Sequence, residues 1–204
     1  MPYTRTFLAL GDSYTIGEGV PEAERWPVQL AGHLRDEGVA IGEPQIVART
    51  GWTTDELSTA MDEAALHPPY DLATLLIGVN NQYRGRALDE YRAQFRTLLT
   101  RAITLAGDDA RRVIVISIPD WGITPFARGE ARDAQQVAAQ IDAFNAIAHE
   151  EANARQARFV DVTGLSRAPD VRGLLTADGL HPSGAQYAHW ADVIAPMARE
   201  ALAN

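Results

Sequence analysis

A serine, an asparagine and an aspartate–histidine pair occupy positions from which they could carry out acyl transfer. Ser13 follows the apolar run 7–10, Asn80 follows the apolar run 72–78, and Asp178 lies three residues before His181 in DGLH. A serine hydroxyl becomes an effective nucleophile when a neighbouring base takes its proton, and histidine suits that task near neutral pH. A carboxylate can orient the histidine and stabilise its protonated form.

Acyl transfer also needs hydrogen-bond donors for the negative oxygen of its tetrahedral intermediate. The side-chain amide of Asn80 can supply one N–H. The backbone N–H of Gly51 can approach closely because glycine carries no Cβ. The N–H of Ser13, at the start of a predicted helix, is a third candidate donor.

Each of these residues also has a simpler explanation when it is considered alone. Ser13 could cap a helix, and Gly51 or Asn80 could serve a turn. Asp178 could stabilise the turn before a glycine, and His181 could be an exposed loop residue. Their joint placement at or beyond the ends of predicted strands favours a single site over separate structural roles.

The elements that must position these residues are predicted by the hydrophobic pattern. Continuously apolar runs, typical of parallel strands covered on both faces, occur at 5–10, 44–48, 72–78, 112–118 and 158–162. Apolar residues at helical spacing predict helices at 26–37, 54–66, 87–106, 131–156 and 184–203. This alternation predicts an α/β protein with a parallel sheet and helices on both faces. Ligands bind at the carboxyl ends of such strands, where 119–130 and 163–182 are predicted as long loops.

Length and composition predict one domain over residues 1–204 and exclude several classes of site. The net charge of −9, without a basic stripe, argues against nucleic-acid binding. The absence of cysteine excludes disulfides, thiolate metal sites and cysteine nucleophiles. No apolar run approaches the roughly 20 residues that span a bilayer, and the N-terminus lacks a signal-peptide pattern. We therefore expect a cytoplasmic protein without stable membrane insertion; its oligomeric state is not predicted.

Other catalytic and binding motifs do not fit the sequence. The G-x-S-x-G elbow fails at Ser13 and at Ser166, and no phosphate-binding loop with its lysine is present. HEEAN at 149–153 lacks the second histidine of H-E-x-x-H. We therefore expect no metal and no cofactor. The remaining histidines are interpreted as surface or packing residues: His33, His67, His149 and His189.

Four separated blocks resemble those of the SGNH, or GDSL-type, serine hydrolases, and they occur in the family's order. The blocks are GDS at 11–13, the glycine at 51, GVNN at 78–81 and DGLH at 178–181. A lone GDS is weak evidence, whereas four blocks at strand ends over most of an α/β chain are specific. Tyr14 replaces the leucine that often follows GDS in the family.

The resemblance implies a role for each matching residue. Ser13 would be the nucleophile, Asp178 and His181 would complete the triad, and Ser13, Gly51 and Asn80 would form the oxyanion hole. It also implies a flavodoxin-like three-layer α/β/α sandwich with a five-stranded parallel sheet in the order 2-1-3-4-5.

One departure from the family pattern concerns Asn81, because the third block usually has aspartate at that position. Asparagine keeps an acceptor oxygen, loses the charge and gains donors. Asn81 could therefore tie down its loop, as the aspartate would, or it could face the substrate.

The resemblance leaves the substrate open, since the family cleaves both esters and thioesters. We expect a serine esterase that hydrolyses a short-chain or O-acetyl ester, of a small molecule, a glycan or a lipid, through an acyl-enzyme. A lysophospholipase or acyl-thioesterase is the alternative within the family. Apart from Asn81, the possible substrate-binding residues are aromatic side chains that flank the catalytic blocks: Trp52, Tyr83 and Trp121. Residues 119–130 carry enough apolar surface to line an acyl pocket.

A different class of protein is a non-catalytic flavodoxin-like module that binds a nucleotide or a flavin at the same strand ends. The missing phosphate loop argues against this alternative. It would also leave the pairing of Asp178 with His181 unexplained.

Overall fold

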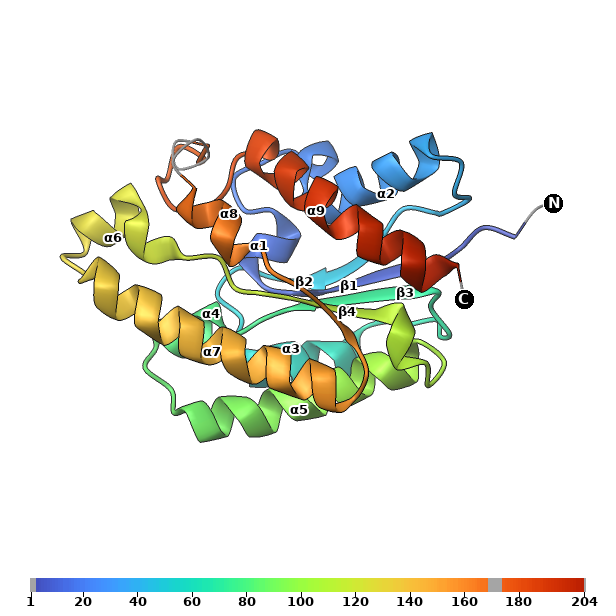
Figure 1. The fold of residues 1–204 in the computed structure, drawn as a ribbon, viewed down its shortest axis with the longest axis horizontal. Coiled ribbons are helices and arrows are strands. Elements are labelled where there is room, and N and C mark those ends of the chain that lie inside the picture. Colours follow the sequence, from blue (N-terminus) through green and yellow to red (C-terminus); the bar gives the residue numbers. More distant parts are fainter. Residues whose placement is uncertain (1–2, 169–173, 204) are drawn as a thin grey trace.

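The computed structural model describes residues 3–168 and 174–203, and it contains the predicted parallel sheet (Figure 1). The sheet order is β2-β1-β3-β4-β5, and every pairing is parallel. This confirms the predicted α/β class and strand order. The strands are β1 (Phe7–Gly11), β2 (Gln45–Ala48), β3 (Leu72–Leu76), β4 (Val113–Ile116) and β5 (Arg158–Val160).

Long helices cover both faces of the sheet (Figure 1). One face carries α2 (Trp26–Asp36) and α9 (Gly184–Leu202), and the other carries α3 (Thr54–Glu63), α5 (Leu88–Leu105) and α7 (Ala134–Ala154). Each of these helices matches a predicted one to within a few residues. Within the part of the chain that the structure describes, every helix is too short or too polar to serve as a transmembrane segment.

Apolar burial on both faces explains why the strands are continuously hydrophobic. All residues of β1, β3 and β4 are buried, since helices pack above and below them. On the α2–α9 face, Trp26 and Trp190 are completely buried, and Tyr187 meets Trp190 edge to face with ring centroids 5.2 Å apart. Aromatic burial of this kind stabilises the packing of α2 and α9 on the sheet.

The register of the central strands places several loops at one edge of the sheet. Gly11 at the end of β1 lies opposite Ala48 of β2 and Leu76 of β3. Ile116 of β4 is level with Val160 of β5. The segments that follow these residues therefore leave the sheet side by side, which brings together blocks that are far apart in the sequence.

Short helices occupy much of the segments that the sequence predicts as loops. Residues 119–130 contain η3 (Trp121–Ile123) and α6 (Pro125–Gly129), and α8 (Thr163–Arg167) begins the second long segment, of which 169–173 lie outside the described residues. Other short elements are α1 (Ser13–Ile16), α4 (Val79–Tyr83), η1 (Glu22–Glu24) and η2 (Ala110–Arg112). In the segment 119–130, local caps form the turns without a hydrophobic period: the side chains of Asp120 and Thr124 accept backbone N–H groups of η3 and α6.

Candidate active site

Ser13 begins the short helix α1, immediately beyond β1. Asp12 is the N-cap, and its Oδ1 accepts a hydrogen bond from the N–H of Tyr14 at 3.1 Å. The turn needs glycine at position 11, because a Cβ there would lie 2.1 Å from Thr15 Oγ1 and 2.6 Å from the carbonyl oxygen of Leu76. This geometry presents the Ser13 side chain at the edge of the sheet, where its Oγ has no hydrogen-bond partner among the described residues.

The carboxyl group of Asp12, the residue before Ser13, is completely buried. Its Oδ2 has no hydrogen-bond donor among the described residues. Burial disfavours the charged form and raises the pKa of Asp12 to about 7. A carboxyl group that is partly protonated near neutral pH therefore precedes the candidate nucleophile in the chain.

His181 is held by a tight turn that Asp178 stabilises. Oδ1 of Asp178 accepts the backbone N–H groups of Leu180 at 2.8 Å and of His181 at 3.0 Å, and its Oδ2 lies 2.6 Å from His181 Nδ1. The hydroxyl of Thr176 donates to the same carboxylate at 2.7 Å. The spacing D-x-x-H suits this arrangement because one carboxylate can accept hydrogen bonds from both the backbone N–H and the imidazole of the histidine.

These contacts set the protonation of Asp178. Partial burial opposes ionisation of Asp178, but hydrogen bonds from His181, Leu180 and Thr176 outweigh it and hold its pKa well below the ordinary value. Asp178 is therefore a carboxylate, so Nδ1 of His181 donates to it and Nε2 is left to exchange a proton. Tyr14 packs against the imidazole with ring centroids 5.7 Å apart, and only 9% of the His181 side chain is exposed.

The loops after β2 and β3 bring Gly51 and Asn80 to the same edge. Gly51 has φ = 87°, a left-handed conformation that favours glycine. Asn80 Nδ2 donates to the carbonyl oxygen of Trp52 at 2.9 Å, which links the two loops. Neither the N–H of Gly51 nor that of Ser13 has an acceptor among the described residues.

Asn81 does not line the cavity, although the sequence left a substrate-facing position open. It is completely buried, where Oδ1 accepts the N–H of Thr54 at 3.1 Å and Nδ2 donates to Thr54 Oγ1 at 2.7 Å. The Thr54 hydroxyl in turn donates to Gln94. Asparagine fits here better than aspartate because the site uses a donor and an acceptor together. Asn81 thus fastens the loop after β3 to the start of α3.

One cavity of about 190 Å³ opens between these loops. It brings together Ser13, Gly51, Asn80 and His181, while Asp178 lies behind His181. Of the predicted substrate-binding residues it includes Tyr83 and Trp121, whereas Trp52 packs against the core and reaches the site through its carbonyl oxygen. The other lining residues are Tyr14, Thr50, Val79, Phe126, Leu180.

The aromatic wall of the cavity is fixed by polar contacts behind it. Trp121 is 2% exposed, and its Nε1 donates to Gln82 Oε1 at 2.8 Å. Gln82 is itself held by Gln140 of α7, at 2.7 Å. Tyr83 and Phe126 meet the indole edge-on, with ring centroids 5.5 and 6.3 Å away. The wall is therefore rigid at Trp121 and open to solvent at Tyr83, which is 39% exposed.

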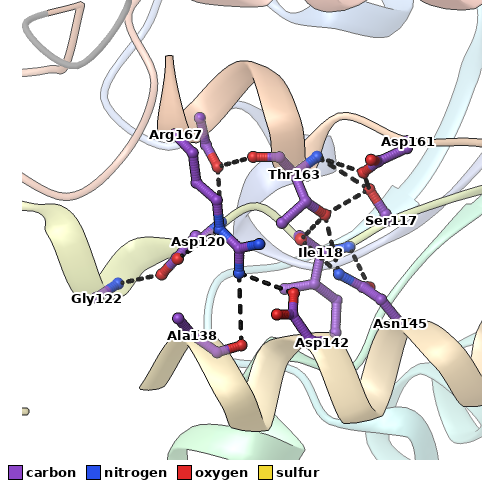
Figure 2. Close-up of polar contacts among 11 residues, drawn as sticks. Ser117, Ile118, Asp120, Gly122, Ala138, Asp142, Asn145, Asp161, Thr163 and Arg167 are labelled. Atoms are coloured by element: carbon purple, nitrogen blue, oxygen red, sulfur yellow. Dashed lines mark hydrogen bonds and ion pairs between the residues drawn. The ribbon is translucent and has the colours of Figure 1, made fainter. Parts of the chain in front are cut away.

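Figure 2 shows how the segment before Trp121 is anchored to α8 and α7. The buried carboxylate of Asp120 accepts the N–H of Gly122 at 2.9 Å and Nε of Arg167 at 2.8 Å. Arg167 also reaches Asp142 of α7 at 2.8 Å. Because Arg167 lies on α8 and Asp142 on α7, the bridge ties Asp120 to two helices and leaves the loop after β4 little freedom to move.

A second part of the same network joins the ends of β4 and β5 (Figure 2). Ser117 Oγ donates to Asp161 Oδ1 at 2.8 Å and accepts the N–H of Thr163 at 3.1 Å. Asn145 of α7 accepts the N–H of Ile118 at 2.7 Å and donates to its carbonyl oxygen at 3.0 Å. These bonds satisfy the backbone beyond the last ladder pairs.

Several residues of this site were not predicted from the sequence. The neighbours of the motif residues, Val79 and Leu180, line the cavity simply because they adjoin Asn80 and His181. The burial of Asp12 could have been predicted, because Asp12 directly follows the apolar run of the buried strand β1. No group of three or more acidic or histidine side chains in residues 3–168 and 174–203 is arranged to hold a metal ion.

A comparison with models of protein families shows which family this chain belongs to. The model of the GDSL-like Lipase/Acylhydrolase family matches residues 9–189, a span that contains every residue of the site described above. The chain belongs to this family. It is therefore an ester hydrolase of the GDSL type, as the four sequence blocks predict. No curated protein matches the sequence.

Solved structures share the fold of this GDSL-type hydrolase at low sequence identity. The lipase/acylhydrolase from Enterococcus faecalis is 20% identical, with a TM-score of 0.74 over 95% of this chain and 94% of the other. The acetyl xylan esterase Axe2 from Geobacillus stearothermophilus is 20% identical, with a TM-score of 0.72 over 97% of each chain. TesA is 20% identical, with a TM-score of 0.71 over 97% of this chain and 100% of that one.

The buried carboxyl of Asp12 predicts a pH-dependent stability. The pKa of Asp12 is about 7 in the folded protein, against an ordinary value of 3.8. Between these pH values the folded state binds more protons than the unfolded state, so the protein loses stability as pH rises. Asp12→Asn keeps the cap acceptor and removes the titration. From pH 5 to pH 7 we expect the unfolding free energy of the variant to gain about 2 kcal/mol relative to the wild type in urea denaturation. A difference that does not vary with pH would contradict the raised pKa.

Proposed function

We propose that the protein is a serine esterase in which Ser13 is the nucleophile, His181 the general base and Asp178 the residue that orients His181. The observation that carries this proposal is one cavity lined by both Ser13 and His181, with Asp178 2.6 Å behind the imidazole. Membership of the GDSL-like family supports it, because the family is one of lipases and acylhydrolases.

The reaction begins when Ser13 Oγ attacks the ester carbonyl carbon and its proton passes to Nε2 of His181. The carbonyl oxygen becomes an oxyanion, and the imidazolium is stabilised by the Asp178 carboxylate. Collapse of this intermediate breaks the bond to the alcohol oxygen, which leaves with the proton from His181. Water then attacks the acyl-Ser13 ester by the same route, releases the carboxylic acid and restores the Ser13 hydroxyl.

Three donors are available for the oxyanion. The N–H groups of Ser13 and Gly51 have no acceptor among the described residues, and Ser13 is the first residue of α1, where the N–H has no helical partner. Asn80 uses one hydrogen of its amide on the carbonyl of Trp52, which fixes the side chain and leaves the second hydrogen for the cavity. Donors fixed before the substrate arrives stabilise the transition state without reorganisation.

The shape of the cavity favours a short acyl group. Its volume is about 190 Å³, and its aromatic wall is held in place by the bonds of Trp121. A small acyl group, such as acetyl, can be accommodated there without moving the wall. The similar fold of an acetyl xylan esterase is consistent with an O-acetyl substrate. A lysophospholipase or thioesterase with a long acyl chain would need that chain to extend past Tyr83 into solvent, where no apolar wall of the described residues contacts it.

Replacing the nucleophile tests the mechanism and the acyl preference together. We expect Ser13→Ala to lower kcat for 4-nitrophenyl acetate by roughly 10⁴-fold or more, because no other group can form the acyl-enzyme. In the wild type, kcat/KM should fall as the acyl group lengthens from acetyl to decanoyl. Ser58→Ala on α3 is a matched control whose activity should equal that of the wild type. Substantial turnover by Ser13→Ala would overturn the assignment, and a preference for decanoyl esters would overturn the short-chain proposal.

The neighbouring asparagines should separate catalysis from stability. Asn80→Ala removes an oxyanion donor and should lower kcat by roughly 10²–10³-fold while the fold persists. Asn81→Ala leaves the buried N–H of Thr54 without an acceptor and should lower the unfolding free energy by about 1–3 kcal/mol. Activity assays and urea denaturation of both variants measure these effects. The reverse pattern, with Asn81 controlling kcat at unchanged stability, would show that the assignment of the two residues is wrong.

A further inference from the structure

Arg132 lies at the rim of the cavity, in the segment between α6 and α7. Its guanidinium carbon is 5.1 Å from the ring centroid of Tyr83 and 6.0 Å from that of Trp121. Both rings line the cavity, whereas Arg132 itself lies outside it and is exposed. The backbone N–H of Arg132 donates to the carbonyl oxygen of Ala127 at 3.0 Å, which fixes the base of the side chain to α6.

Arg132 has no acidic partner among the described residues, unlike three other arginines near the site. Arg84 lies 3.4 Å from Glu56, Arg86 lies 2.6 Å from Asp55, and Arg167 lies 2.8 Å from Asp120. No carboxylate of the described residues lies within 4.0 Å of the Arg132 guanidinium, although the protein has a net charge of −9. Among the described residues, its positive charge therefore has aromatic rings and no ion-pair partner beside it.

The guanidinium of Arg132 makes no hydrogen bond to another described residue, so its N–H donors are available to a ligand. These donors lie in the plane of the group and point outward from its edge. A planar fork of this kind matches the oxygens of a carboxylate or phosphate and can bind them through two hydrogen bonds. Because the rings restrain the side chain beforehand, less conformational entropy is lost when an anion binds.

We propose that Arg132 is a specificity-determining residue that binds an anionic group, a carboxylate or a phosphate, on the ester substrate. The anionic group would lie at the rim beside Tyr83 and Trp121, a short distance from the ester carbonyl placed at Ser13. This inference rests on the proposed esterase function and extends it: the preferred substrates are esters that carry a negative charge near the scissile bond. The charge can be on the acyl part or on the alcohol part.

Matched pairs of substrates test the proposal in two arms. The acyl arm compares 4-nitrophenyl hydrogen glutarate with neutral 4-nitrophenyl pentanoate, and the alcohol arm compares 4-acetoxybenzoate with its methyl ester. The quantity measured is the ratio of kcat/KM for the anionic ester to that for the neutral ester. In Arg132→Gln we expect this ratio to fall about tenfold in one of the arms, as the loss of a charge-assisted hydrogen bond implies. The arm that responds identifies which part of the substrate carries the charge.

Two further measurements separate recognition from packing and from net charge. The wild-type ratio should decrease as salt rises from 10 mM to 500 mM, because the rim is exposed to solvent. Arg111→Gln makes the same change in net charge at η2, where Arg111 pairs with Asp109 at 2.8 Å, and should leave both ratios unchanged.

Ratios that Arg132→Gln leaves unchanged in both arms would overturn the role of Arg132, and so would an equal fall in Arg111→Gln. Loss of kcat/KM for anionic and neutral esters alike would mean that Arg132 only supports the aromatic wall, and it would also overturn the proposal. Failure of the esterase function itself would be recognised separately. In that case Ser13→Ala would hydrolyse the neutral esters as fast as the wild type.

Discussion

The carboxylate of Asp178 is the group on which the arrangement of the site depends. It accepts two backbone N–H groups within its own turn, the hydroxyl of Thr176 and the Nδ1 proton of His181. Because these bonds favour ionisation, the carboxylate remains charged and keeps the imidazole in one orientation. The same bonds shape the turn that carries Leu180 into the cavity wall. Loss of this one charge would release the imidazole and the wall together.

The parallel sheet supplies the second constraint, because its strands end at a common edge. The register of β1 with β2 and β3 brings the segments of Ser13, Gly51 and Asn80 to that common edge. The sharp turn into α1 needs Gly11 and a buried Asp12, whose raised pKa records the cost of placing a carboxyl group in the core. Side-chain bonds then tie the loops to helices, through Asn81 to α3 and through Asp120 and Arg167 to α8 and α7.

The sheet and its long helices could be predicted from the sequence because their signal is periodic. Runs such as 72–78 are apolar throughout since both faces are covered, and helices such as α5 repeat apolar residues every three or four positions. Short helices such as α6 and α8 were missed because five residues are too few to show a period.

The residues proposed as catalytic were selected by their types and spacing, and the structure places two of them, Ser13 and His181, at one cavity. The role of Asn81 could not be predicted, because a sequence does not distinguish an amide side chain that points into the core from one that faces a ligand. Arg132 gave no signal either, since its position over Tyr83 depends on how α6 and α7 pack. Such contacts between segments distant in the chain are decided by tertiary packing.

The most direct test of the central claim is the rate at which diethyl 4-nitrophenyl phosphate modifies Ser13, followed by peptide mass spectrometry in the wild type and in His181→Ala. An activated serine should carry the diethylphosphoryl group in the wild type, and its modification should be roughly 10²-fold slower or more without the general base. Equal rates in the two proteins, or modification of a different residue, would contradict the claim that Ser13 is activated by the histidine that Asp178 holds.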